Sequence, residues 1–214
     1  DTPWIEAKRA EHPFVVANGI LIDGTSLTGD LVIPDNVTFI GSGVFIDGSG
    51  VTSIVIPDSV TQINEMAFYA CRELQSVVIP DTITNIGDMV FGGCESLTEI
   101  NIPETVTSIG DYAFYDCKKL AEINIPNSVT SIGEFAFRNC SALESIVIPD
   151  GITSICKGTF QECRSLNSII LPESLTHIGI YAFNYCKKLN SITIPSAVTY
   201  IEKGAFKNCI KLSE

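Results

Sequence analysis

Apolar and polar positions along the chain repeat with a period of 23 residues, and no insertion interrupts this period. Phenylalanine and proline each occupy one position of every unit: Phe45, Phe68, Phe91, Phe114, Phe137, Phe160, Phe183 and Phe206, and Pro34, Pro57, Pro80, Pro103, Pro126, Pro149, Pro172 and Pro195. From the second unit onward a cysteine and a leucine recur as well: Cys71, Cys94, Cys117, Cys140, Cys163, Cys186 and Cys209, and Leu74, Leu97, Leu120, Leu143, Leu166, Leu189 and Leu212. A fixed period of this length is typical of a solenoid, in which each unit buries its apolar face by stacking on its neighbours.

Each unit contains a short segment in which apolar and polar residues alternate up to the repeat proline, as in Leu97 to Pro103. This alternation predicts a strand, and a proline is compatible with the end of a hydrogen-bonded ladder. One strand per unit, always in the same direction, predicts a parallel sheet. We expect its strands near residues 53–56, 76–79, 99–102, 122–125, 145–148, 168–171 and 191–194.

The rest of each unit predicts a second corner and a tight turn. In "VTSIG" we expect Val106 and Ile109 to point inward, and the recurring threonine predicts a second β-like ladder with stacked hydroxyl groups. The next segment, "DYAFYDC", is long enough for one helical or 3₁₀ turn that places Ala113, Phe114 and Cys117 in the core. Glycines at the corner between them predict positive φ angles, at Gly41, Gly87, Gly110, Gly133 and Gly179.

Residues 1–30 do not follow the period and are expected to form an N-terminal cap. A short amphipathic helix anchored by Trp4 and Ile5 is expected first, followed by a hairpin with a type I′ turn at Asn18-Gly19. Residues 31–214 hold the repeats, of which the last is incomplete. The chain ends where the next strand is due, which indicates a piece of a longer protein.

The unit resembles the BspA-like, or Treponema pallidum-type, leucine-rich repeat, whose consensus runs close to "CxxLxxIxIPxxVTxIGxxAFxxC". The similarity covers about residues 31–212, and the motif is highly specific. The resemblance implies a leucine-rich-repeat solenoid with parallel strands on one face and short helical or 3₁₀ turns opposite. It also implies a secreted or cell-surface protein, of an anaerobic bacterium in particular, with a role in adhesion and protein binding. It brings no catalytic residue and no cofactor.

Composition narrows the choice of partners. The formal net charge is −12, and no basic stripe exists to displace counterions from phosphates, so nucleic acid is not an expected partner. No apolar run reaches the length of a transmembrane helix, so membrane insertion is not expected either. We expect a monomer that binds a protein or a glycan.

The eight cysteines allow two interpretations. Because all but Cys156 hold the same slot of the repeat, the sequence favours a buried ladder of free thiols over disulfides. Cys156 replaces a glycine of other units and is either a tolerated substitution or a partly exposed thiol. The two histidines, His12 and His177, lie far apart in sequence and no Cys-x-x-Cys occurs, so neither a metal site nor Cys-His catalysis is predicted.

The residue after the repeat proline is acidic in most units: Asp35, Asp58, Asp81, Glu104, Asp150 and Glu173. A ladder of carboxylates at stacking distance is one way to bind calcium. Asp and Glu after proline are also ordinary turn residues that water solvates, and the sequence favours this second interpretation.

Strand alternation predicts which residues face outward on the sheet. Five of the eight units place Ser and a β-branched residue there, the first places Asp and Val, and two central units place Glu and Asn instead. An acidic, hydrogen-bonding centre flanked by apolar strips predicts a surface for a basic or polar partner. The candidate binding residues are Glu99, Asn101, Glu122, Asn124, Val55, Val78, Val147 and Ile170.

Two classes of function remain open. The first is a non-catalytic binding module for a protein or glycan, and the second is a rigid spacer that presents a neighbouring domain of a longer protein. A recent copying of near-identical units is a further explanation of the shared Glu and Asn. The sequence offers no support for an enzyme.

Overall fold

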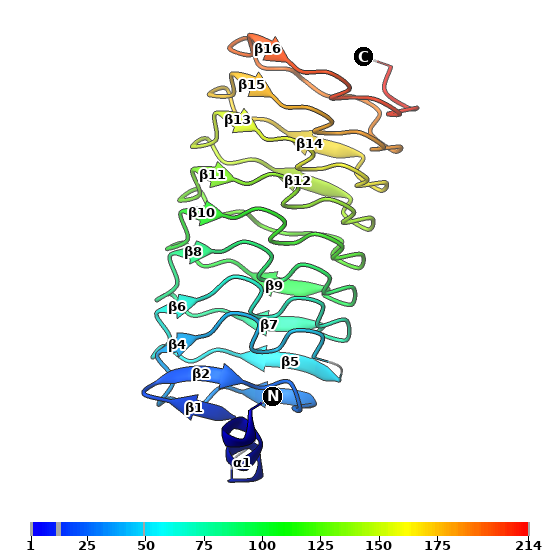
Figure 1. The fold of residues 1–214 in the computed structure, drawn as a ribbon. Helices are drawn as coiled ribbons and strands as arrows, with labels where there is room; N and C mark the ends of the chain where they lie inside the picture. Colours follow the sequence, from blue (N-terminus) through cyan, green and yellow to red (C-terminus); the bar gives the residue numbers. More distant parts are fainter. Residues whose placement is uncertain (1, 12–13, 49, 214) are drawn as a thin grey trace.

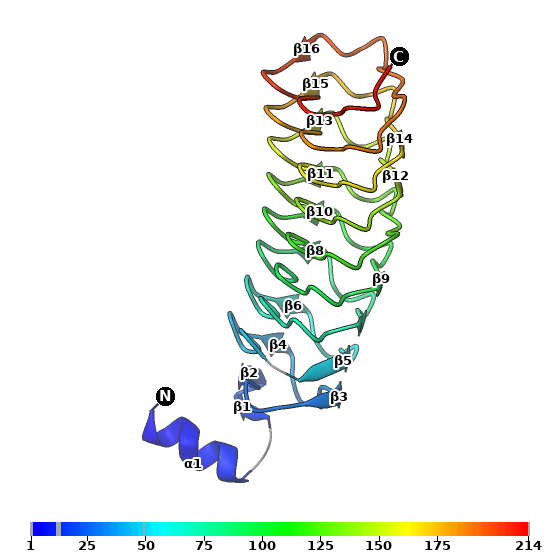
Figure 2. The same cartoon turned by 90° about the vertical axis from the view of Figure 1, so that its right-hand side faces the viewer.

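The computed structural model describes residues 2–11, 14–48 and 50–213. The repeats form a column of stacked coils, one coil for each 23-residue unit, above a single short helix (Figures 1 and 2). Two rows of short strands run along the column. The predicted parallel-strand solenoid is therefore confirmed.

The first row of strands is formed by the segments that precede the repeat proline. It consists of β3 (Gly29–Val32), β5 (Val51–Val55), β7 (Ser76–Val78), β9 (Glu99–Asn101), β12 (Ser145–Val147) and β14 (Ser168–Ile170). All pairings are parallel, and from β5 onward each residue pairs with the residue 23 positions later, as Ser76 does with Glu99. We call the surface formed by the outward residues of this row, from Asp30 to Thr193, the long-strand face.

The long-strand face is interrupted where two predicted strands do not form. Residues 122–125 lie between β9 and β12 and belong to neither sheet, so the row divides into β3-β5-β7-β9 and β12-β14. In register, Glu122 would lie beside Glu99 and Asn124 beside Asn101. Like charges side by side and asparagine, which is rare in strands, both weaken pairing. The segment 191–194 is not a strand either, and within the described residues it has a coil on one side only.

A second row of two-residue strands lies a few residues after the repeat proline of each coil. It contains β4 (Phe39–Ile40), β6 (Gln62–Ile63), β8 (Asn85–Ile86), β10 (Ser108–Ile109), β11 (Ser131–Ile132), β13 (Ser154–Ile155), β15 (His177–Ile178) and β16 (Tyr200–Ile201). The predicted second ladder is thus present, with Val106 and Ile109 buried. The threonines do not stack hydroxyl on hydroxyl: Thr107 Oγ1 donates instead to the carbonyl of Thr84, 3.2 Å away, and Thr130 Oγ1 to that of Thr107.

None of the corner glycines Gly41, Gly87, Gly110, Gly133 and Gly179 has a positive φ, which corrects the prediction, and all but Gly87 instead serve a close approach of the backbone. A Cβ on Gly110 would lie 2.7 Å from the backbone nitrogen of Asp88, and one on Gly133 would lie 2.6 Å from that of Asp111. The absence of a side chain lets the next coil pass at this distance.

The left-handed residues lie in the turn opposite the corner. Two residues of every unit, four positions apart, have positive φ, as in Met66 (58°) and Ala70 (57°) or Tyr112 (55°) and Asp116 (57°). Bonds from residue i to i+3, typical of a 3₁₀ turn, are present, but each left-handed residue reverses the path before a helix can form. Backbone bonds to the next coil stabilise this conformation: the N–H groups of Met66, Phe68 and Ala70 all donate to carbonyls one unit later.

The core is a column of stacked rings and thiols. The phenylalanine rings stack from Phe45 to Phe206 with centroids 5.2–5.7 Å apart. The repeat cysteines are free, and each thiol donates to the carbonyl of the phenylalanine 26 residues earlier, as Cys117 Sγ does to Phe91 at 3.2 Å. Ala113, Phe114 and Cys117 are fully buried, as predicted. The disulfide alternative does not hold for these cysteines.

We expect thiol titration to separate the fully buried thiols of the ladder from Cys156 and Cys209, which are half-buried. Denatured, unreduced protein should react at all eight cysteines, since none is bonded to another. In the native protein, burial raises the pKa of Cys71 to about 12 and raises that of Cys156 to a lesser degree. Because the thiolate is the nucleophile, Cys156 and Cys209 should react slowly at neutral pH and faster as pH rises, and the fully buried thiols not at all. Rapid labelling of Cys117 in native protein would contradict the buried ladder.

The N-terminal segment contains helix α1 (Pro3–Glu11) and an antiparallel hairpin of β1 (Val15–Ala17) and β2 (Ile20–Asp23). Asn18 and Gly19 both have positive φ, as a type I′ turn requires, and β2 pairs with β4 of the first coil. Trp4 does not anchor the helix, because it is 49% exposed. The helix projects from the column (Figure 2) and is held by Arg9, which pairs with Asp23 at 2.5 Å. No helix in the described ranges has the length and apolar character needed to cross a bilayer.

Candidate functional site

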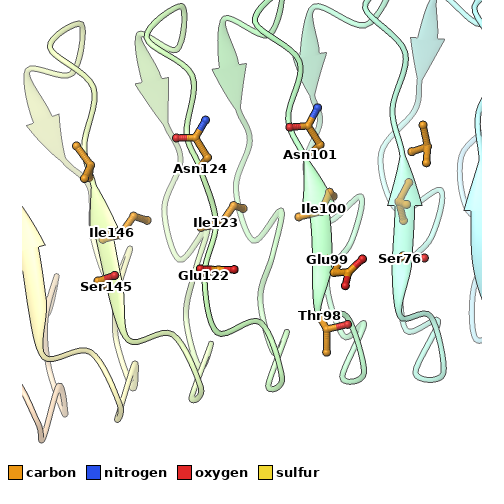
Figure 3. A pocket seen from close by; sticks show the side chains of 13 residues that line it. Ser76, Thr98, Glu99, Ile100, Asn101, Glu122, Ile123, Asn124, Ser145 and Ile146 are labelled. Atoms are coloured by element: carbon orange, nitrogen blue, oxygen red, sulfur yellow. The ribbon is translucent and has the colours of Figure 1, made fainter.

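A shallow depression lies on the long-strand face, where the row of strands is interrupted (Figure 3). Its volume is about 660 Å³. Glu99 and Glu122 form one row of polar side chains on neighbouring coils, Asn101 and Asn124 form a second row, and Ile100 and Ile123 lie between the rows. The coil 122–125 runs through the middle of the depression, between β9 and β12.

The structure brings most of the predicted binding residues together here. Glu99, Asn101, Glu122 and Asn124 are exposed and line the depression, and Val78 and Val147 border it on the two flanking coils. Val55 and Ile170, the other two candidates, do not line it. They lie one coil further out in each direction and are 39% and 60% exposed. The predicted outward orientation of all eight side chains is therefore confirmed, while their role in binding stays a prediction.

The carboxylates and side-chain amides at the centre of the depression have no partner among the described residues, whereas the Thr98 hydroxyl donates to the carbonyl of Gln75. Neither the carboxylates of Glu99 and Glu122 nor the amides of Asn101 and Asn124 make a hydrogen bond or ion pair there, and the lining contains no Lys, Arg or His. Asp30 on the same face is different, because its carboxylate accepts from Ser53 at 2.7 Å and from Thr52 at 2.8 Å, which lowers its pKa. The central acceptors thus remain available to a partner molecule.

Sequence reasoning missed the apolar floor and the break in the sheet. Ile100 is only half-buried, unlike the buried apolar residue that most other strands place in this slot, such as Ile54, and Ile123 is 8% exposed. Thr98 also lines the depression. The signal was present in the printed sequence: glutamate follows glutamate and asparagine follows asparagine at in-register positions of adjacent units. This is the arrangement that opposes strand pairing.

The other candidate groups lie elsewhere. His177 is half-buried in the second row of strands, where its Nε2 lies 2.7 Å from Glu202 Oε1 and its ring stacks on Tyr200. The imidazole is therefore bonded to a carboxylate and not to a thiol. His12 falls outside the described residues. In the part of the chain that the structure describes, no three His, Cys, Asp or Glu side chains are grouped to hold a metal ion.

Comparisons with known proteins agree with the geometry. The BspA type leucine-rich repeat region, in six copies, matches residues 23–144 and 107–214. The chain is similar to a solved leucine-rich repeat protein of Treponema pallidum, with 30% identity and a TM-score of 0.74 over 79% of this chain and 82% of that one. A leucine-rich repeat protein from Bacteroides ovatus is 31% identical, with a TM-score of 0.65 over 81% of this chain and 53% of that chain.

A third solved structure is a leucine-rich cell surface protein from Faecalibacterium prausnitzii, with 27% identity and a TM-score of 0.50 over 87% of this chain and 72% of that one. Comparison with curated proteins gives no match.

Proposed function

Because the chain belongs to the BspA-type leucine-rich repeat family, we propose that it is a non-catalytic module that binds a protein or glycan through the long-strand face. The repeat family itself suggests a protein-interaction or scaffold role. The fold provides an extended, regular surface. Stacking between the coils fixes the identity of the buried residues beneath it. Outward side chains are free to vary, and binding specificity resides in them.

The observation that carries this proposal is the depression at the interrupted strand row. Exposed acceptors without a partner lie at its centre, and exposed Val78 and Val147 lie at its borders. A polar centre between apolar strips offers a partner both hydrogen bonds and buried apolar area. No other part of the described long-strand face combines carboxylates and amides that lack a partner with exposed valines.

We place this module outside the cell or on its surface, in a role such as adhesion of a bacterium to a host or to another cell. The support is the solved relative that is described as a cell surface protein. The expected monomeric state belongs to this proposal as well.

The alternative function is a rigid spacer for a neighbouring domain. It is supported by the continuous stack of phenylalanine rings and thiols, which joins every coil to the next and stiffens the column. A spacer needs no special face, so changes confined to the depression should leave it intact.

We expect the fourfold variant Glu99→Ser, Asn101→Val, Glu122→Ser, Asn124→Val to lose capture of partners from cell-surface extracts, measured by pull-down and mass spectrometry. The variant installs the residues of neighbouring coils, so its thermal unfolding midpoint should not fall. Asp81→Ser with Glu104→Ser is the control, because it removes two exposed carboxylates from adjacent coils at the proline corner. Equal capture by parent and fourfold variant would favour the spacer.

A further inference from the structure

We propose that the depression binds arginine side chains of an extended, basic segment of a partner protein, an inference that rests on the proposed function. The occupant follows from charge, hydrogen-bonding capacity and shape. Each of these properties is carried by the six residues Glu99, Ile100, Asn101, Glu122, Ile123 and Asn124.

Charge complementarity requires a cation. Glu99 and Glu122 lie in one row on consecutive coils (Figure 3), and these two coils are joined by the parallel strands β10 and β11, whose spacing is about 4.8 Å. No cation lines the depression, and the chain as a whole carries a formal net charge of −12. Two carboxylates this close repel each other, and a partner cation between them relieves the repulsion. The repulsion that prevents strand pairing thus also favours a ligand of positive charge.

The chemistry of the lining favours guanidinium over ammonium. The amide oxygens of Asn101 and Asn124 add acceptors beside the carboxylates, which matches the several fixed N–H donors of arginine. The floor at Ile100 and Ile123 is apolar. Guanidinium is weakly hydrated and loses little on contact with such a floor, whereas ammonium is strongly hydrated.

The borders favour an extended protein segment over a glycan or a metal ion. Val78 and Val147 offer apolar contacts on either side of the acidic centre, which suits a strand-like segment with apolar residues next to its arginines. The lining contains no aromatic ring on which a sugar would stack. The described residues also hold no group of three potential metal ligands.

The test uses three fluorescent peptides in which valine alternates with arginine, lysine or citrulline. Citrulline keeps the shape of arginine but has no charge. Binding is followed by fluorescence anisotropy at physiological salt, where exposed charges interact over about 8 Å. We expect the arginine peptide to bind about tenfold more tightly than either of the others, because only arginine combines charge with a planar set of donors.

Variants inside and outside the depression show where the arginine peptide binds. Glu99→Gln with Glu122→Gln keeps the side-chain shape and should weaken the arginine peptide about tenfold, since the charge-assisted bonds are lost. The matched control Asp81→Asn with Glu104→Gln removes the same charge elsewhere and should leave binding unchanged. Circular dichroism verifies that all variants fold.

Each contrary outcome has a distinct meaning. Equal binding of the arginine and lysine peptides, or equal weakening in both variants, would show general attraction to an acidic surface and overturn the proposal. If no peptide binds while extract capture still depends on the depression, the arginine occupant is wrong and the proposed function stands. If capture is also independent of the depression, both fail.

Discussion

Replacement of Phe114 by alanine is expected to destabilise the solenoid by about 3–5 kcal/mol, the usual cost of removing a fully buried ring. Phe114 is 0% exposed and stacks on two rings, Phe91 at 5.7 Å and Phe137 at 5.3 Å. Its loss leaves a cavity in the middle of the column, and the neighbouring coils are held at their spacing by backbone bonds and cannot close it. The measurement is guanidinium denaturation followed by circular dichroism.

Phe206→Ala provides the matched control. Phe206 occupies the same slot in the last coil, is only partly buried, and among the described rings stacks on Phe183 alone. We expect a loss of about 1–3 kcal/mol there, in keeping with the smaller area removed from water. Equal losses at both positions would mean that the core does not depend on stacking from both sides.

The second large effect is expected at Gly110. A Cβ at this position would lie 2.7 Å from the backbone nitrogen of Asp88 and 2.8 Å from the carbonyl carbon of Gly87. Backbone atoms cannot rotate away as a side chain can, so Gly110→Ala must push two coils apart. We expect a loss of about 1–3 kcal/mol in the free energy of unfolding, the usual cost of overpacking.

Gly87→Ala tests the same slot where space is available. Its nearest neighbour would be Val90 Cγ2 at 3.6 Å, an ordinary contact, and its φ is not positive. Because alanine restricts the unfolded chain, we expect no loss and a gain of up to about 1 kcal/mol. Similar losses for Gly87→Ala and Gly110→Ala would contradict the explanation by close approach.

The fold was predictable because the residues of the core recur with the 23-residue period. The repeat phenylalanines, leucines and cysteines each hold a fixed slot, and a strict interval leaves stacking as the arrangement that buries them together. The outward orientation of Glu99, Asn101, Glu122 and Asn124 followed from alternation alone. These features depend on the spacing within one unit, which the sequence displays directly.

The features that sequence reasoning missed depend on the next coil. Met66 and Tyr112 adopt positive φ because their N–H groups bond to carbonyls one unit later, a conformation that no local propensity of these residues predicts. The corner glycines were assigned to positive φ by local rules, while at Gly110 and Gly133 the actual requirement is the short distance to a neighbouring backbone. Trp4 was expected to anchor the N-terminal helix, but an ion pair of Arg9 does so instead.

The depression was partly predictable. Charge and alternation identified its polar residues, but the effect of two identical neighbours on strand pairing was not considered. Residues 122–125 were therefore expected to be a strand, and the half-buried Ile100 was expected to be enclosed. Both errors have one cause: pairing is decided between adjacent coils and not within one of them.

The constant interval also affects how the chain reaches its native state. Each thiol finds its acceptor 26 residues earlier and each strand its partner 23 residues later, so a coil that skips one neighbour meets the same slots again. Looping out 23 residues costs about 3 kcal/mol of closure entropy, a modest penalty against such misregister. Off-register stacking is thus a kinetic trap inherent in this architecture. Only features that differ between coils, such as the contact of His177 Nε2 with Glu202 Oε1 at 2.7 Å, distinguish the correct neighbour from the next one.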